Sequence, residues 1–188
     1  EPRFETGEIE VAERLAHHQR AAGRVEQSLE PLRAAAALYT ARAEYERAIE
    51  VLDDHAAAAC ALEGPARTFE EVENRLGEAE VRAATGEFDR ASELIGRALA
   101  DSRQLGRDDL VARAMSLAGY VASLRGDDAN AEALLAEALQ RFDQLGRSTD
   151  AARCLRGLAE IAANEGRTDV AFQAHLAALE HCRALADE

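Results

Sequence analysis

The sequence predicts an all-α protein in which about nine helices stack as helical hairpins to form an α-α solenoid. Ala and Leu dominate a chain that is 47% hydrophobic but only 4% aromatic, with no Trp. Such a composition favours helix. The chain of 188 residues has 3 prolines, and no stretch shows the alternating pattern of strands. Similar segments recur 40 residues apart, and periods of about 20 to 50 residues are typical of stacked supersecondary units.

The N-terminal helices, within residues 6–62, are expected to be the less regular ones. Residues 9–24 predict a helix that ends at Gly23, with one side formed by Ile9, Ala12, Leu15, Ala16 and Gln19. A second helix is expected from about Val25 to Arg42, where Pro31 should kink it or mark a restart. A third follows in residues 43–62, with Tyr45 and Ala48 in register with Phe88 and Ala91 of the later repeats. The segment 63–65, "EGP", is the clearest break.

Three regular 40-residue repeats are expected at 68–107, 108–147 and 148–188, all within a single domain that covers residues 1–188. Each repeat resolves into two helices, with Gly86, Gly126 or Gly166 at the turn. The tetrapeptide "QLGR" ends the second helix at 104–107 and at 144–147, whereas the third copy reads "ALAD". Leucine at the matching positions, Leu105, Leu145 and Leu185, is predicted to be the last buried contact of the second helix. In the first repeat, Glu78 and Arg82 replace alanines of the second, which indicates a local change of helix phase.

The middle repeat illustrates the expected packing. Asp108 and Asp109 should cap a helix that runs to about Leu124 and buries Val111, Met115, Ala118 and Ala122. The second helix should bury Ala131, Leu134, Leu135, Ala138, Leu139 and Phe142 and end at Gly146, after which Ser148 or Thr149 opens the next repeat. The small residues Gly119, Ala131 and Ala138 would let the helix backbones approach closely.

This alternation resembles the tetratricopeptide repeat family. The matching positions are Gly119, the turn glycines Gly86, Gly126 and Gly166, Phe88, and the alanines Ala91, Ala131, Ala171, Ala98, Ala138 and Ala178. The family's signature Trp, Tyr and closing Pro are absent, and the 40-residue period resembles the longer repeats of bacterial signalling proteins. The resemblance implies a right-handed solenoid whose first helices line a concave groove.

The N-terminal segment 13–52 carries a second resemblance. It is similar to the helical segment that follows the ATPase module in bacterial kinase-, cyclase- and LuxR-type regulators. The matching features are Leu15-Ala16-His17-His18, Ala22-Gly23, Pro31, Arg33-Ala34-Ala35 and the stretch 45–52. This similarity implies a fragment of a larger regulator, and the absence of an initial Met agrees with that expectation.

Charge and hydropathy favour a cytoplasmic protein that binds neither nucleic acid nor membranes. The formal net charge is −14, which opposes attraction to phosphates or anionic lipids. No apolar run approaches the roughly 20 residues that span a bilayer, and no signal peptide opens the chain. All 22 basic residues are Arg, which suggests a GC-rich bacterial genome.

No residue set points to catalysis, a cofactor or a metal. The chain has no Lys for a phosphate loop and no GxSxG or HExxH motif. Adjacent His17 and His18 point in different directions on a helix and are expected to cap or pack. A zinc site with His175, His181, Cys182 and Cys154 is the weaker alternative to burial of the three cysteines, Cys60, Cys154 and Cys182, as small apolar residues. The sequence therefore predicts a protein that is not an enzyme.

The expected groove residues lie one helix face away from the buried stripe. They are Glu80, Arg113, Ser116, Tyr120, Arg153, Arg156, Glu160 and Asn164, with Glu73 beside them. Its arginines could bind the carboxylates of an acidic peptide or domain, or could merely pair with Glu160 and Asp150. The Asn and Lys clamp of chaperone-binding family members is not matched, because Glu80, Tyr120 and Glu160 stand at the Asn position.

The leading hypothesis is a non-enzymatic protein–protein interaction scaffold, part of a larger bacterial signalling or transcriptional regulator. Its partner would be a protein or peptide, or other domains of the same polypeptide. The alternative is a sensor that binds a peptide or small molecule in the concave groove. A third hypothesis is a homodimer formed by stacking of exposed solenoid ends.

Overall fold

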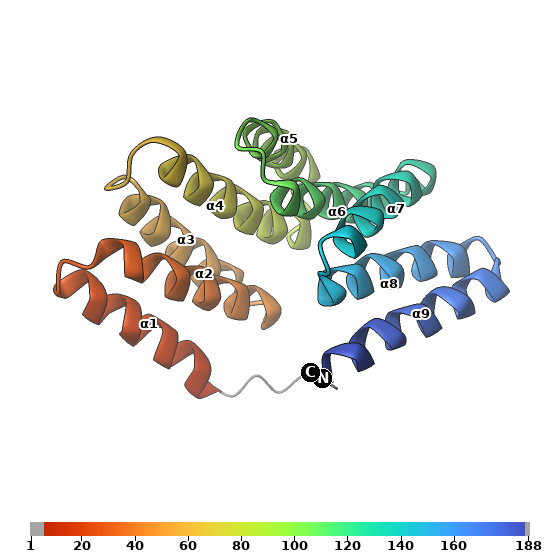
Figure 1. Ribbon diagram of the computed structural model, residues 1–188, viewed down its shortest axis with the longest axis horizontal. Helices are drawn as coiled ribbons and strands as arrows, with labels where there is room; N and C mark the ends of the chain where they lie inside the picture. Colours follow the sequence, from red (N-terminus) through yellow and green to blue (C-terminus); the bar gives the residue numbers. More distant parts are fainter. Residues whose placement is uncertain (1–5, 187–188) are drawn as a thin grey trace. The chain divides into compact units, whose positions relative to one another are not determined.

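Nine α-helices and no strand make up residues 6–186, the part of the chain that this computed structural model describes; its side chains are described from residue 7 to residue 183 (Figure 1). In chain order they are α1 (Thr6–Ala21), α2 (Val25–Ala41), α3 (Tyr45–Ala59), α4 (Gly64–Ala84), α5 (Phe88–Gln104), α6 (Asp108–Leu124), α7 (Asp128–Gln144), α8 (Ser148–Asn164) and α9 (Thr168–Ala186). The predicted all-α helical-repeat fold is confirmed. Most helix bounds agree closely with the expected ones. Helix α4, however, begins at Gly64 rather than near Thr68, so Gly64 and Pro65 of the expected break at 63–65 belong to this helix.

Glycines with positive φ separate most of the helices. Gly126, between α6 and α7, has a φ of 78°, and the amide of Asp127 after it donates to the carbonyl of Ala122 at 3.0 Å. Gly146 has a φ of 66° and plays the same role after α7. This left-handed conformation is what ends a helix and reverses the chain. At the α2–α3 turn an alanine, Ala43, takes it instead, with a φ of 60°.

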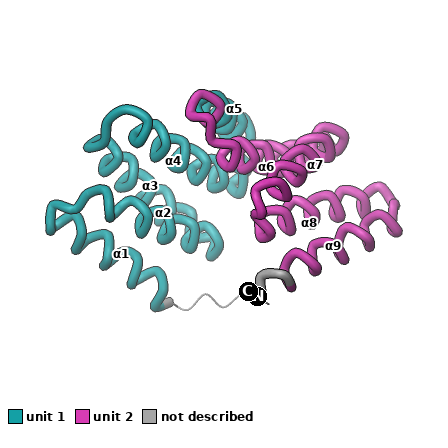
Figure 2. Tube along the Cα trace, in the orientation of Figure 1, with its two compact units in different colours: residues 1–101 teal, residues 102–188 magenta. Residues whose placement is uncertain are grey.

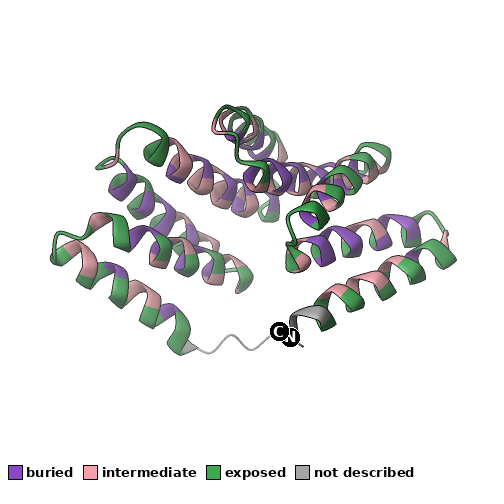
Figure 3. Ribbon diagram, viewed as in Figure 1, coloured by how far each residue is buried: buried purple, intermediate pink, exposed green. Residues whose placement is uncertain are grey.

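The chain divides into two compact units, residues 1–101 and 102–188 (Figure 2). In unit 1, α2 packs against α1, α3 and α4, and α3 packs against α4. Its core includes Leu29, Leu32, Val51 and Leu52. In α2 and α3 the buried residues, purple in Figure 3, form one amphipathic stripe. Helix α4 also buries Glu70 and Val81, on the side opposite to its main stripe.

Unit 2 contains α6 to α9, each packed against the next, and α6 also contacts α8. Leu135 of α7 is buried between two glycines of neighbouring helices. A Cβ added at Gly119 of α6 would lie 2.8 Å from the Leu135 Cγ, and one at Gly157 of α8 would lie 3.0 Å from its Cδ1. The expected close approach at Gly119 is therefore confirmed, and Gly157 provides a second one that the sequence analysis did not identify.

One expectation about helix ends is wrong, and of the kink or restart expected at Pro31 the restart is excluded. The N-cap of α6 is Arg107, without a side-chain cap bond, and Asp109 lies inside the first turn, where the Arg107 guanidinium binds its carboxylate at 2.7 Å. This pairing lowers the pKa of Asp109. The expected restart at Pro31 does not occur, because α2 continues through that residue.

Several burial expectations also differ from the structure. Cys60 and Cys182 are exposed, and only Cys154 is buried. Leu145 is 43% exposed, whereas Phe142, one turn earlier, is 1% exposed and makes the last buried contact of α7. Leu15 is 46% exposed, while Ala118, Leu134 and Leu139 are half-buried. The side chain of Leu185 lies outside the described residues.

Candidate interaction face

Seven of the predicted site residues lie on two neighbouring helices of unit 2. Helix α6 carries Arg113, Ser116 and Tyr120, and α8 carries Arg153, Arg156, Glu160 and Asn164. A shift of 40 residues superposes 113 on 153, 116 on 156 and 120 on 160, so the two sets occupy equivalent faces of helices that contact each other. We refer to these seven residues as the candidate interaction face. Glu80 belongs to α4 in unit 1 and is half-buried.

The arginines of α8 are largely exposed. Arg153 Nη1 lies 3.9 Å from Asp150 Oδ1, and Arg156 Nε lies 3.9 Å from Glu160 Oε1. Their side chains are 60% and 66% exposed. Such exposed pairs contribute little to stability, since water and salt screen them. Both guanidinium groups therefore remain accessible to a carboxylate of another molecule.

Ser116 contributes to packing between the two helices. Its Oγ accepts a hydrogen bond from the Cys154 Sγ at 3.4 Å, and its side chain is half-buried. Burial raises the pKa of the Cys154 thiol, so the reactive thiolate form is disfavoured. This contact fixes α6 against α8 beneath the exposed side chains.

An exposed leucine extends the candidate interaction face. Leu124 is 44% exposed, and Tyr120, one turn before it on α6, is 48% exposed. The 40-residue shift places Leu124 at the position of Asn164, a correspondence that could have identified it from the sequence. Tyr120 and Leu124 give α6 an apolar surface beside the arginines of α8, a combination enriched in protein interfaces.

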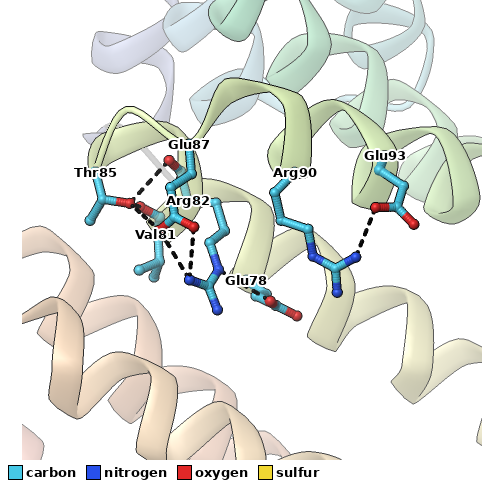
Figure 4. Close-up of polar contacts among 7 residues, drawn as sticks. All are labelled: Glu78, Val81, Arg82, Thr85, Glu87, Arg90 and Glu93. Carbon is cyan, nitrogen blue, oxygen red and sulfur yellow. Dashed lines mark hydrogen bonds and ion pairs between the residues drawn. The ribbon is translucent and has the colours of Figure 1, made fainter.

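In unit 1, polar residues of α4 bind other parts of the same unit. Glu73 Oε1 lies 3.8 Å from Arg33 Nη1, and its side chain is 12% exposed. Arg82 donates to Glu78 at 3.2 Å and to Glu87 at 3.0 Å (Figure 4). The predicted stripe of α4 buries Val72, Leu76, Ala79 and Ala83 and leaves Phe69 half-buried.

The turn after α4 is also closed by polar contacts. Thr85 Oγ1 donates to the Val81 carbonyl and to Glu87 Oε1, each at 3.1 Å (Figure 4). The Arg82 guanidinium, followed by the Thr85 hydroxyl, lowers the pKa of Glu87. These contacts hold the start of α5 against the end of α4.

A buried polar cluster joins α2, α3 and α4, and nothing in the sequence pattern had indicated it. His55 is fully buried, with its Nε2 3.0 Å from Glu70 Oε2, and Arg33 Nη1 donates to the same oxygen at 3.2 Å. The amide of Asn74 donates to the Leu52 carbonyl at 2.6 Å and lies 3.3 Å from His55 Nδ1. His55 Nδ1 is therefore an acceptor, and Nε2 donates to Glu70.

The described residues include no group of three or more His, Cys, Asp or Glu side chains that could hold a metal ion. His17 and His18 are exposed, and their rings meet edge to face with centroids 6.0 Å apart. His181 Nε2 lies 3.6 Å from Asp143, which gives this histidine a polar neighbour on α7. None of the helices in this part of the chain is long and apolar enough to cross a membrane.

The fold is identified by its similarity to solved structures. No family model and no curated protein matches the chain. The crystal structure of BtubC (BKLC) from P. vanneervenii is similar, with a TM-score of 0.65 and 22% identity over 95% of this chain and 71% of that one. A crystal structure of nearly identical tetratricopeptide-like repeats, assigned to a kinesin light chain of Podosopora anserina, gives a TM-score of 0.56 and 17% identity, covering 97% of this chain and 96% of that one. The fold is thus a helical-repeat fold of the tetratricopeptide type.

Proposed function

We propose that this protein is a non-enzymatic interaction scaffold that binds an acidic segment of a partner protein through the candidate interaction face. The observation that carries the proposal is the pair of arginines on α8, whose side chains are 60% and 66% exposed. Arginine forms bidentate, charge-assisted hydrogen bonds to carboxylates. Tyr120 and Leu124 of α6 would supply the apolar contact beside them.

The wider setting of this function is also a proposal. The similarity of segment 13–52 to regulator helices supports the hypothesis that this chain is a fragment of a larger bacterial signalling or transcriptional regulator. The partner segment would then belong to another protein or to a sister domain of the same polypeptide.

The test is a binding titration with a fluorescein-labelled peptide that is rich in Glu and Leu. The variant Arg153→Glu/Arg156→Glu should bind this peptide about tenfold more weakly, since it removes two charge-assisted contacts and adds repulsion. The matched control is Arg90→Glu/Arg97→Glu on α5, whose side chains are 45% and 62% exposed. It changes the net charge by the same amount, so any difference between the two variants is local to the face.

Equal affinity of the two variants for the peptide would overturn the proposal. A thermal shift produced by low-molecular-mass compounds, with no peptide binding, would instead favour the sensor hypothesis. The peptide's charge-reversed counterpart, rich in Lys and Leu, should bind no better to the wild-type protein than to the variant.

A further inference from the structure

Helix α9 presents an apolar stripe on the side that faces away from its own hairpin. Phe172, Leu176 and Leu179 are 59%, 39% and 53% exposed, and their spacing places them on one face of the helix. The opposite side, with buried Ala171 and half-buried Ala174 and Ala178, packs where α9 contacts α8. Most of α9 is exposed or half-buried in Figure 3.

The repeat accounts for Leu179 but not for Phe172 and Leu176. Leu139 of α7 and Leu99 of α5, both half-buried, stand at the position of Leu179. In α7, Glu132 and Ala136 stand at the positions of Phe172 and Leu176, and in α5 Ser92 and Gly96 do. Ser92, Gly96 and Ala136 are exposed, and Glu132 is paired with Arg167 at 3.0 Å. The earlier helices thus leave these positions polar or small, and only α9 makes them apolar.

A further hairpin of the same kind would use a different part of α9. In α7 the next hairpin packs on Leu135, which lies against Gly157 of α8, and Phe142 is 1% exposed. The equivalent residues of α9 are His175 and Cys182, and both are exposed. His175 and Cys182 therefore do not offer the large apolar contacts that Leu135 and Phe142 of α7 provide. A neighbouring face of α9 carries new apolar side chains, Phe172 and Leu176.

Opposite charges flank the stripe symmetrically. Asp169 lies seven residues before Leu176, and Arg183 lies seven residues after it. The series 169, 172, 176, 179, 183 has alternating steps of three and four, the spacing of a helix–helix contact line. Asp169 and Arg183 are exposed and are about 21 Å apart along the helix, too far to pair with each other.

We propose that α9 is a self-association surface, on which two copies of this chain pair antiparallel about a two-fold axis at Leu176. Asp169 then faces Arg183 of the second copy, and this contact occurs twice because the interface is isologous. Phe172 of each copy lies beside Leu179 of the other. The surface is separate from the candidate interaction face on α6 and α8, so the two proposals can fail independently.

The contact is small, because each copy contributes one helix with three large apolar side chains. Interfaces of this size belong to the weak and transient class, well below the roughly 1,200 Å² of total area that stable complexes bury. The dimer should therefore appear only at high protein concentration. Charge complementarity, which weak interfaces use to set orientation, specifies the antiparallel arrangement.

The test is sedimentation equilibrium of the full chain over a wide concentration range. The wild-type protein should show a monomer–dimer equilibrium, and Leu176→Glu should abolish it. The matched control is Ala136→Glu at the equivalent exposed position of α7, which should dimerise like the wild type. Circular dichroism and melting should be the same for all of these variants, because both substituted side chains are exposed.

The charge arrangement has its own test. Asp169→Arg places like charges together at both contact points and should weaken the dimer by about fivefold or more, as should Arg183→Asp. The double variant Asp169→Arg/Arg183→Asp should restore the wild-type affinity, a rescue that no merely structural effect produces. The proposal would be overturned if the chain stayed monomeric at all concentrations, or if the single and double variants dimerised with equal affinity. The apolar stripe would then be a surface for a different protein.

Discussion

Ala43 takes a left-handed backbone conformation, with a φ of 60°, at the turn between α2 and α3. The 40-residue repeats have glycine at the matching place, as at Gly126 with its φ of 78°. A Cβ in this conformation costs about 1–2 kcal/mol. Ala43 therefore stores strain in unit 1 that the regular repeats avoid.

The variant Ala43→Gly should raise the free energy of unfolding by about 0.5–1 kcal/mol. Relief of strain exceeds the extra freedom that glycine gives the unfolded chain, and urea denaturation measures the difference. The reverse change, Gly126→Ala, should cost a similar amount. A Cβ at Gly126 meets nothing within 4 Å, so its effect is purely conformational. Stabilisation by both changes would contradict this account.

Single residues also show which features can be predicted from the sequence and which cannot. The turn glycines were predictable because the left-handed conformation is a local requirement. The exposure of Cys60 and Cys182 was not, since it depends on which helix face a neighbour covers. For the same reason, the candidate interaction face follows from helix phase and register, whereas the exposed fractions of Arg153 and Arg156 follow only from the structure.

At the scale of elements, the helices follow from periodicity and turn signals, but their polar contacts do not. The pattern predicted the buried stripe of α4 and the close approach at Gly119. It did not predict that Arg33, His55 and Glu70 would meet, because these residues come from three helices and each is acceptable on a solvent-exposed face. Tertiary packing of α2, α3 and α4 brings them together.

Removal of Glu70 should destabilise this packing strongly. Glu70 is 9% exposed and binds both His55 and Arg33. Glu70→Ala therefore leaves the buried His55 donor without its carboxylate acceptor and removes the nearer of the two carboxylates beside Arg33. We expect a loss of about 2–4 kcal/mol in the free energy of unfolding, measured by urea denaturation. The exposed pair of Arg90 and Glu93 on α5 (Figure 4) is the control, and Glu93→Ala should cost about 0.5 kcal/mol or less. Similar losses for the two variants would show that burial adds nothing to the cluster.

The contact between α6 and α7 makes a second prediction at this scale. In Gly119→Ala the new Cβ would lie 2.8 Å from the Leu135 Cγ and 3.3 Å from the Ala131 carbonyl oxygen. Overpacking exceeds the gain in helix propensity, so the free energy of unfolding should fall by about 1 kcal/mol. Gly96→Ala on α5 is the matched control, since its Cβ meets nothing within 4 Å. That control should be stabilised by about 0.5–1 kcal/mol in the same thermal or chemical denaturation.

At the scale of the whole molecule, the continuity of α5 is the central feature. The boundary between the two compact units falls after Asp101, inside a helix that runs unbroken from Phe88 to Gln104. The 40-residue register also continues across this boundary, from Gly86 to Gly126. Because helix formation is cooperative and repeat proteins couple neighbouring units, the sequence expectation of one domain remains our proposal.

A change in unit 2 should therefore destabilise unit 1 as well. In Gly119→Ala, the opening free energies of the most protected amides in α2 should fall by the same amount as those in α6, because one cooperative domain opens as a whole. Native-state hydrogen exchange measures both sets in one experiment. Gly96→Ala should shift both sets in the opposite direction. Loss of protection confined to α6 and its neighbours in unit 2 would show that the units unfold independently.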